Sequence, residues 1–345
     1  MCFSKNKNLL SVVMLLSAGV SHAANINGSS KINELYFTGY HNTYAHFDEY
    51  QNGTDKYIND LSHFLDNYRS IELDVWESAG VQYISHDLPI PARRDSNCEN
   101  DHLDRCLVKI VNYVRDNKED KRPLLLGIEV KWGFKQVNAA AREVVNNNPD
   151  IFYTPADMIA HFESINDSSI IEYGRISLRE AIRAHGWPTI DELGDKKIII
   201  YYTGGGAGNA KDNNKRIGGY IKQSLITQDH GAGVGFPCPT VTKADQVYPH
   251  KYWIDGEGES EYLICNSIKW DSSNINSIAI TSNENNFLLR AWDSTKRDHT
   301  QNYQTAIDLI KRGVNIYDNE TKGYVPLTGS NGASLPVVGK RSDLL

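Results

Sequence analysis

Two carboxylates in the segment SIELDVWE give the sequence its clearest chemical signal. Glu72 and Asp74 lie two residues apart, and the side chains of a strand alternate between its two faces, so both acids point to the same side. Ile71, Leu73 and Val75 point to the other side, which disfavours an exposed edge strand with two solvated acids. Two carboxylates on one buried face repel each other and favour protonation unless a cation lies between them. The pair therefore favours a metal site.

The segment LGIEVKW repeats this design, with Glu129 and Lys131 on one face of a second strand and apolar residues on the other. One interpretation is a buried ion pair inside the protein. The other is a third carboxylate for the cation, together with a lysine for an anionic substrate. The residues alone leave both interpretations open.

Histidines end two other apolar segments. His41 follows LYFTGY and has Asn42 beside it, and His86 follows YIS. A histidine after a strand is by itself more often a structural turn residue than a catalyst. Two histidines beside a hard cation, however, suggest general acid–base chemistry on a phosphate ester. The oxygen donors available for Ca²⁺ or Mg²⁺ are Asn42, Glu72, Asp74 and Glu129.

Motifs of other enzyme classes are missing from the sequence. It has no G-x-S-x-G, no H-E-x-x-H and no convincing cysteine nucleophile motif. The stretch TGGGAGNAKDNNK lacks the Gly-Lys-Ser/Thr ending and the spacing of nucleotide-binding loops. No nucleotide is therefore expected as a ligand.

Apolar strands alternate with amphipathic helices along the chain, which predicts parallel βα units. Expected strands cover 34–40, 70–76, 124–132, 196–203, 286–292 and 314–318, and 81–86 is expected to be the return arm of a hairpin. Expected helices cover 57–68, 103–114 and 303–310, and two more begin at Thr154-Pro155 and at Ser177. Polar residues gather near the carboxyl ends of the strands, where barrels build their active sites. The pattern favours an α/β fold of the TIM (β/α)8 barrel type, with an open doubly wound sheet as the alternative.

The length of the chain and its alternation of strands and helices indicate the domain organisation. The chain has 345 residues and no evident internal linker, so residues 24–345 are expected to form one catalytic barrel domain. The segment 204–284 breaks the alternation of strands and helices. It is expected to be a long insertion over the mouth of the barrel.

Residues 1–23 have the features of a cleavable signal peptide: Lys5 and Lys7, an apolar run over 9–20, and the small residues of SHA. The run is too short to span a bilayer. Cleavage would change the formal charge from −7 to −9, because two lysines and no acid leave with the segment. An acidic protein is a poor candidate for binding nucleic acid. We expect a monomer that is secreted or periplasmic.

Four cysteines remain after the expected cleavage, and an even number in an exported protein suggests two disulfides. Three connectivities are possible. Proximity in sequence favours Cys98–Cys106 and Cys238–Cys265. The spacings match no zinc pattern, so metal ligation by these cysteines is the weaker alternative.

Together these motifs resemble the calcium-dependent phosphatidylinositol-specific phospholipases C, and more narrowly their exported, single-domain bacterial and fungal branch. The matching order is HN before TY, then IELDVW, SHD and IEVK. The segments ISLREAIRAHGWPTIDELGDKKIIIYY, LLRAWD and GVNIYD are also similar to that branch. The resemblance covers roughly 35–202 and 287–319, and the combination is specific although no single motif is.

The resemblance implies a distorted TIM (β/α)8 barrel of the PLC-like phosphodiesterase type, with Ca²⁺ rather than Mg²⁺ at its mouth. It also implies a phospholipid substrate at a membrane surface. The positions that match the family's calcium ligands are Asn42, Glu72, Asp74 and Glu129.

The resemblance also implies roles for the remaining site residues. His41 matches the histidine that stabilises the phosphoryl transition state, and His86 matches the general acid towards the leaving glycerol oxygen. Glu72 is the expected acceptor of the inositol 2-hydroxyl proton. Lys131 matches a lysine that binds phosphate or head group, and Arg290 is a candidate for head-group contact. The products would be diacylglycerol and a cyclic inositol phosphate, which water can open.

Two kinds of alternative are weighed against this one. Glycerophosphodiester phosphodiesterases and sphingomyelinase-D-like enzymes have two histidines and a Glu-x-Asp pair on the same fold. The former usually begin with His-Arg-Gly, whereas this chain has His41-Asn42-Thr43, in which asparagine suits a neutral metal ligand. The second alternative is an exported binding protein without catalysis, against which the complete set of histidines and carboxylates argues.

Overall fold

The computed structural model describes residues 26–44, 47–48, 56–57, 61–85, 97–172, 174–203, 233–247, 263–292, 299–319, 327–330, 332 and 334–345. Several sequence-based expectations lie outside these residues. They are the signal peptide at 1–23, the general acid His86, and the stretches 204–232 and 248–262 of the expected insertion, which include the glycine-rich loop.

A ring of parallel strands forms the centre of the described fold. The strands are β1 (Leu35–Tyr40), β4 (Ser70–Ser78), β6 (Leu124–Trp132), β9 (Ile198–Thr203), β10 (Gly235–Pro237), β11 (Cys265–Lys269), β12 (Leu288–Trp292) and β13 (Ile316–Asn319). Neighbours in the sheet follow the order β10-β9-β6-β4-β1-β13-β12-β11. Strands that follow one another along the chain are therefore neighbours in the sheet, as in a (β/α)8 barrel, except that β10 and β11 form the two ends of this order.

The ring is nearly closed by a short contact between β11 and the residues that follow β10. The backbone N–H of Ser267 donates to the carbonyl of Pro239 at 2.7 Å, and the N–H of Val241 donates to the carbonyl of Ser267 at 2.9 Å. The disulfide Cys238–Cys265 joins the same two segments. The predicted distorted TIM barrel is thus confirmed, and the open sheet is not what forms.

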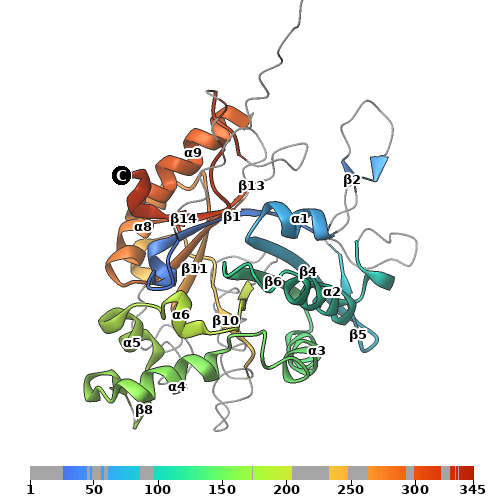
Figure 1. The fold of residues 1–345 in the computed structure, drawn as a ribbon, viewed down its shortest axis with the longest axis horizontal. Coiled ribbons are helices and arrows are strands. Elements are labelled where there is room, and N and C mark those ends of the chain that lie inside the picture. The colour runs from blue at the N-terminus through green and yellow to red at the C-terminus, as the bar shows by residue number, and fades with distance from the viewer. Residues whose placement is uncertain are drawn as a thin grey trace, which may run out of the picture.

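Helices surround this ring, with α1, α2 and α3 on one side and α8 and α9 on another (Figure 1). Their bounds are α1 (Leu61–Asn67), α2 (Leu103–Asp116), α3 (Phe134–Asn146), α4 (Pro155–Ile165), α5 (Leu178–His185), α6 (Ile190–Leu193), α8 (Ile275–Glu284) and α9 (His299–Arg312). The predicted start signals act as caps, because Thr154 accepts from the N–H of Asp157 and Ser177 from the N–H of Glu180.

Short elements complete the described fold. The minor strands are β2 (Phe47–Asp48), β3 (Lys56–Tyr57), β5 (Val81–Ile84), β7 (Ile171–Glu172), β8 (Arg175–Ile176) and β14 (Val338–Lys340). The 3₁₀ turns are η1 (Ile32–Glu34), η2 (Glu99–Asp101), η3 (Ser168–Ile170), η4 (Ala244–Gln246) and η6 (Arg341–Leu344). Strand β5 pairs antiparallel with β4, which confirms the predicted hairpin.

Two boundaries differ from the sequence-based expectation. Tyr57 lies in strand β3, whereas a helix was expected from residue 57, and α1 begins at Leu61. The interval 204–284 contains β10, η4, β11 and α8, and two of these are strands of the barrel sheet. That interval therefore holds part of the barrel itself, in addition to the two stretches outside the described residues.

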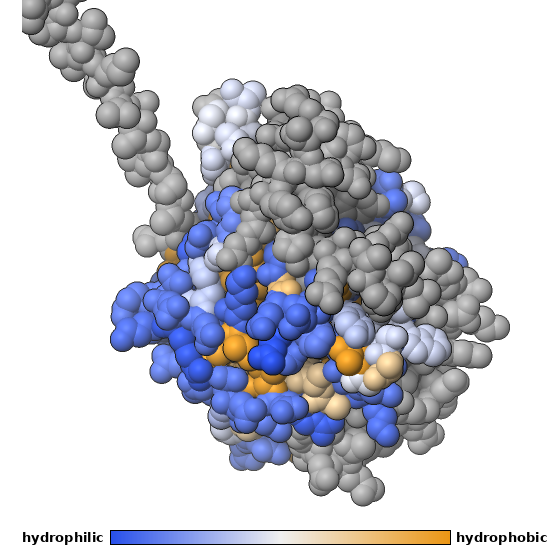
Figure 2. Space-filling model, turned by 90° about the vertical axis from the view of Figure 1, so that its right-hand side faces the viewer, coloured by the Kyte–Doolittle hydropathy of each residue, from blue (hydrophilic) through white to orange (hydrophobic). Residues whose placement is uncertain are grey.

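Both expected disulfides are present. Cys98 pairs with Cys106 and Cys238 pairs with Cys265, which fits a protein of an oxidising compartment. The face drawn in Figure 2 is mostly hydrophilic where it is described, with separate apolar patches. The described residues include no helix that is both long enough and apolar enough to cross a membrane.

Candidate active site

The carboxylates predicted from the sequence meet at the mouth of the barrel, the end formed by the carboxyl ends of the strands. Strands β4 and β6 are parallel neighbours, and Asp74 lies beside Glu129 in their register. One carboxylate oxygen from each of Glu72, Asp74 and Glu129 lies within 4.8 Å of the others. The side chains of Glu72 and Asp74 are at most 1% exposed. The alternation along two adjacent strands therefore brings all three acids together, as expected.

The turn after β1 brings His41 and Asn42 against the same acids. His41 Nε2 lies 3.2 Å from Glu72 Oε2. Asn42 has a left-handed backbone (φ 59°), which asparagine adopts more easily than most residues. This conformation directs its backbone N–H towards Glu72 Oε2, at 3.4 Å.

The next two residues of this turn belong to the site, although their roles were not predicted. The Tyr44 hydroxyl lies 2.8 Å from Asp74 Oδ2 and 3.1 Å from Asn42 Oδ1, and so connects the turn to β4. The Thr43 hydroxyl donates to the carbonyl of Glu72 at 2.6 Å and accepts from its N–H at 3.0 Å. Their position directly after His41-Asn42 is the sequence signal that could have identified them.

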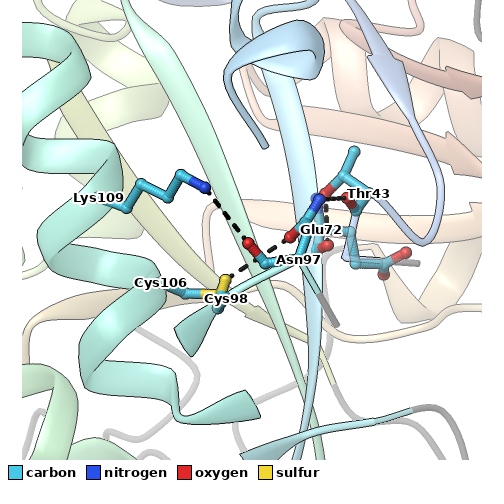
Figure 3. The surroundings of a disulfide bond; sticks show 6 residues. All are labelled: Thr43, Glu72, Asn97, Cys98, Cys106 and Lys109. Carbon is cyan, nitrogen blue, oxygen red and sulfur yellow. Dashed lines mark hydrogen bonds between the residues drawn. A yellow bond between two sulfur atoms is a disulfide. The ribbon is translucent and has the colours of Figure 1, made fainter. Parts of the chain in front are cut away.

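The disulfide Cys98–Cys106 anchors the segment that contacts this turn (Figure 3). Cys106 of α2 is bonded to Cys98, which holds the preceding residue Asn97 next to the turn. The side-chain amide of Asn97 donates to the carbonyl of Thr43, and its backbone N–H donates to the carbonyl of Tyr44, both at 3.0 Å. The turn is thereby attached to a helix as well as to β4.

Two cations are paired with the acids. Lys131 Nζ lies 2.8 Å from Glu129 Oε2 and 3.1 Å from Asp74 Oδ2. Arg290 Nη2 lies 2.8 Å from Glu72 Oε1, and its Nε donates to Asp318. Both cations, expected to contact the substrate, are thus in ion pairs. Asp318 was not predicted as a site residue. Its position at the carboxyl end of the expected strand VNIYD, where barrels build their active sites, is the signal that could have identified it.

We name the six charged residues together the mouth cluster: Glu72, Asp74, Glu129, Lys131, Arg290 and Asp318. Counted in their charged forms, they comprise four carboxylates and two cations, an excess of two negative charges. This excess of negative charge affects the pKa of Asp74. Burial, and then the repulsion of Glu129 and Glu72, raises the pKa of Asp74 well above its usual range.

The other two acids of β4 and β6 differ from each other. Burial raises the pKa of Glu72, and the charge of Arg290 offsets only part of that rise. Burial also acts to raise the pKa of Glu129, but the adjacent Lys131 outweighs it and the pKa is lowered. Among these three acids, the two carboxylates of β4 therefore have the less compensated charge.

This donor set fits a divalent hard cation. Three carboxylates within 4.8 Å supply the oxygen ligands that Ca²⁺ prefers, and the two excess negative charges equal the charge of one such ion. The amide oxygen of Asn42 adds a neutral donor, which the Tyr44 hydroxyl links to Asp74. The residues predicted as ligands are thus brought together, whereas His86 lies outside the described residues.

Two solved structures of one bacterial enzyme resemble the chain in fold. They are of a calcium-dependent phosphoinositol-specific phospholipase C from the Gram-negative bacterium Pseudomonas sp.. An apo crystal form aligns with a TM-score of 0.63 at 17% sequence identity, covering 88% of this chain and 97% of that one. The myoinositol complex gives a TM-score of 0.64 at 18% identity, with the same coverage. No protein-family model and no curated protein matches the chain. The predicted phospholipase C-like barrel fold is therefore confirmed.

Proposed function

We propose that the protein is a calcium-dependent phosphodiesterase that cleaves the glycerol–phosphate bond of phosphatidylinositol-type lipids. The observation that carries the proposal is the convergence of His41 and Asn42 with three buried carboxylates at the mouth of the barrel. The fold shared with the Pseudomonas phospholipase C supports it.

The chain's own residues have distinct parts in the proposed reaction. Glu72, Asp74, Glu129 and Asn42 would hold Ca²⁺, which when bound would lower the pKa of the inositol 2-hydroxyl and offset charge on the phosphoryl group. Glu72 takes the proton of the inositol 2-hydroxyl while the oxygen of that hydroxyl forms a bond to phosphorus. His41 stabilises the negative phosphoryl oxygens, and it already lies 3.2 Å from Glu72.

The second half of the proposed reaction is the departure of the leaving group, diacylglycerol. The bond between phosphorus and the glycerol oxygen breaks, and His86 is proposed to protonate that oxygen so that diacylglycerol departs. The other product is a cyclic inositol phosphate. Water can open this ring by the reverse route, with the protons returning through the same two groups.

We also propose that the mouth of the barrel meets a membrane surface. Trp132, the last residue of β6, follows Lys131 directly and is 62% exposed. Tryptophan combines a large apolar surface with a polar N–H group and is favoured where a protein meets the lipid interface. An exposed tryptophan at the carboxyl end of the strand that carries Glu129 suits an enzyme whose substrate lies in a bilayer.

One panel of assays tests the proposal. The protein without its first 23 residues is incubated with phosphatidylinositol, its phosphates, phosphatidylcholine, sphingomyelin and glycerophosphoinositol, in calcium or in chelator. Phosphorus NMR separates cyclic from acyclic products. We expect a cyclic inositol phosphate from phosphatidylinositol in calcium and no turnover in chelator. Turnover that persists in chelator would refute the metal assignment, and turnover of water-soluble diesters alone would favour the glycerophosphodiesterase alternative.

A further inference from the structure

Arg290 lies one layer below the mouth of the barrel. It precedes Trp292, the last residue of β12, by two positions, so its side chain shares the face of Trp292 at a deeper level. The side chain is 3% exposed. A group with so little accessible surface is poorly placed to contact a lipid head group, which was its expected role.

The guanidinium of Arg290 instead joins two acids from two other strands. Its Nη2 meets Glu72 of β4 at 2.8 Å, and its Nε donates to Asp318 of β13. These contacts use different nitrogens of one rigid, planar, permanently charged group. A lysine has a single terminal nitrogen on a flexible chain and cannot reproduce this fork.

Two glycines within strands make room for this arrangement. A Cβ on Gly39 of β1 would lie 1.8 Å from Asp318 Oδ1, and a Cβ on Gly127 of β6 would lie 2.7 Å from the Tyr201 hydroxyl oxygen. Arg290 in turn lies over the Tyr201 ring, with its Cζ 5.9 Å from the ring centre. A glycine inside a strand weakens it and often marks a close approach of other groups. Both glycines are therefore explained by the groups that hold Arg290.

These contacts fix the orientation of the Glu72 carboxylate. Its Oε1 forms an ion pair with Arg290 Nη2 at 2.8 Å, and its Oε2 faces the turn after β1, 3.2 Å from His41 Nε2 and 3.4 Å from the backbone nitrogen of Asn42. A carboxylate without such a partner could rotate about its last torsion. Groups behind a ligand commonly set its orientation and hence the affinity of the site.

We propose that Arg290 and Asp318 act as positioning residues that orient Glu72 for calcium binding and proton transfer, and that Arg290 does not contact the substrate. This inference rests on the proposed function, in which Glu72 is a calcium ligand and the proton acceptor.

The experiment compares Arg290→Lys with a matched substitution at the opposite end of the barrel. Arg69 is also buried, with a side chain 6% exposed, and also pairs with an acid, Asp120. Arg69→Lys therefore makes the same chemical change away from the mouth. Asp318→Asn is the third variant, because it keeps the shape of the side chain and removes its charge. Each protein is examined by thermal unfolding, by calorimetric titration with calcium, and by kcat and KM on phosphatidylinositol in mixed micelles.

We expect Arg290→Lys to weaken calcium binding by about 10- to 100-fold, the range found when a group behind a metal ligand is changed. The kcat should fall while KM changes little, because substrate contacts remain. Asp318→Asn should give a smaller loss in the same direction. Arg69→Lys should lower the unfolding temperature and leave the calcium affinity within about twofold of wild type.

Two results would overturn the positioning role. One is an unchanged calcium affinity in Arg290→Lys and Asp318→Asn with a raised KM, which would restore Arg290 as a substrate contact. The other is an equal loss of calcium affinity in Arg69→Lys, which would show a general effect of destabilisation. Failure of the wild-type protein to bind calcium would be a separate result. It would refute the proposed function and remove the basis of this inference.

Discussion

Cations pair with carboxylates at both ends of the barrel, but in opposite proportions. At the floor, the end formed by the amino ends of the strands, Arg69 and Arg122 share the carboxylate of Asp120. We name these three residues the floor cluster. In the mouth cluster, four carboxylates share two cations. The floor cluster thus has an excess of one positive charge, and the mouth cluster has an excess of two negative charges.

The pKa values of Asp120 in the floor cluster and Asp74 in the mouth cluster are shifted in opposite directions. Burial acts to raise the pKa of Asp120, but the hydrogen bonds from Arg122 and the charge of Arg69 outweigh it and the pKa is lowered. Burial and repulsion instead raise the pKa of Asp74. An ion-pair network with a lowered acid pKa stabilises the fold, whereas buried acids that repel each other mark a site prepared for a ligand. The floor cluster therefore stabilises the barrel, whereas the mouth cluster is suited to bind a ligand.

The largest expected effect is on catalysis at the mouth. His41→Ala should lower kcat by about 10²- to 10³-fold, because a donor to the phosphoryl transition state is lost. Calcium affinity, measured by titration calorimetry, should stay close to that of wild type. His185→Ala is the matched control, since His185 also pairs with an acid, Asp167 at 2.9 Å, but lies at the end of α5. Equal losses of activity in both variants would contradict the assignment of His41.

The second-largest effect is expected for a substitution of Asp74, which should weaken calcium binding without lowering the stability of the calcium-free protein. Asp74→Asn should weaken calcium binding by at least ~10-fold, because a charged ligand is replaced by a neutral one. The raised pKa of Asp74 means that its ionised form costs stability as the pH rises above the unfolded value of about 4. In chelator at pH 7, urea denaturation should therefore show that Asp74→Asn is as stable as wild type or more stable. A clear loss of stability would argue that the mouth is a purely structural network.

The floor should respond with the opposite sign. Asp120→Asn should reduce the free energy of unfolding at pH 7 by about 1–3 kcal/mol, because two buried or half-buried arginines lose their shared carboxylate. The lowered pKa of Asp120 means that its stabilisation is complete above about pH 4 and is lost as the pH falls further. Urea denaturation at several pH values should show a difference from wild type that shrinks below pH 4. A difference independent of pH would contradict this account of the floor cluster.

The smallest effect tests the link between the turn and β4. Tyr44→Phe removes the hydroxyl that lies between Asp74 and Asn42, and should weaken calcium binding about fivefold, which corresponds to about 1 kcal/mol. Tyr113→Phe is the control, because the Tyr113 hydroxyl donates to Asp66 at 2.6 Å in a position that borders the floor cluster. The same change in calcium affinity for both variants would remove Tyr44 from the site.

Much of this arrangement could be predicted from the sequence because it depends on local rules. Alternation in SIELDVWE and LGIEVKW placed Glu72, Asp74 and Glu129 on inward faces, and parallel strands carry such faces to one end of a barrel. The capping residues Thr154 and Ser177 marked the start of two helices by the same kind of local chemistry.

The rest depended on contacts between distant parts of the chain. Strand β10 has three residues, Gly235–Pro237, and its place is set by the closing of the ring, so it left no periodic signal within 204–284. The helix expected from Tyr57 begins only at Leu61, because Tyr57 pairs with Phe47 in the antiparallel ladder of β2 and β3. The pairing of Arg290 with Asp318 depends on which strands become neighbours, which no single segment records.

Titration of the wild-type protein with calcium, by calorimetry at pH 6 in two buffers of different ionisation heat, tests the central claim most directly. We expect calcium to bind with release of protons, because the pKa values of Glu72 and Asp74 are raised and ligand carboxylates must be deprotonated. A titration without calcium binding, or binding that persists unchanged when Glu72 and Asp74 are both replaced by their amides, would contradict it.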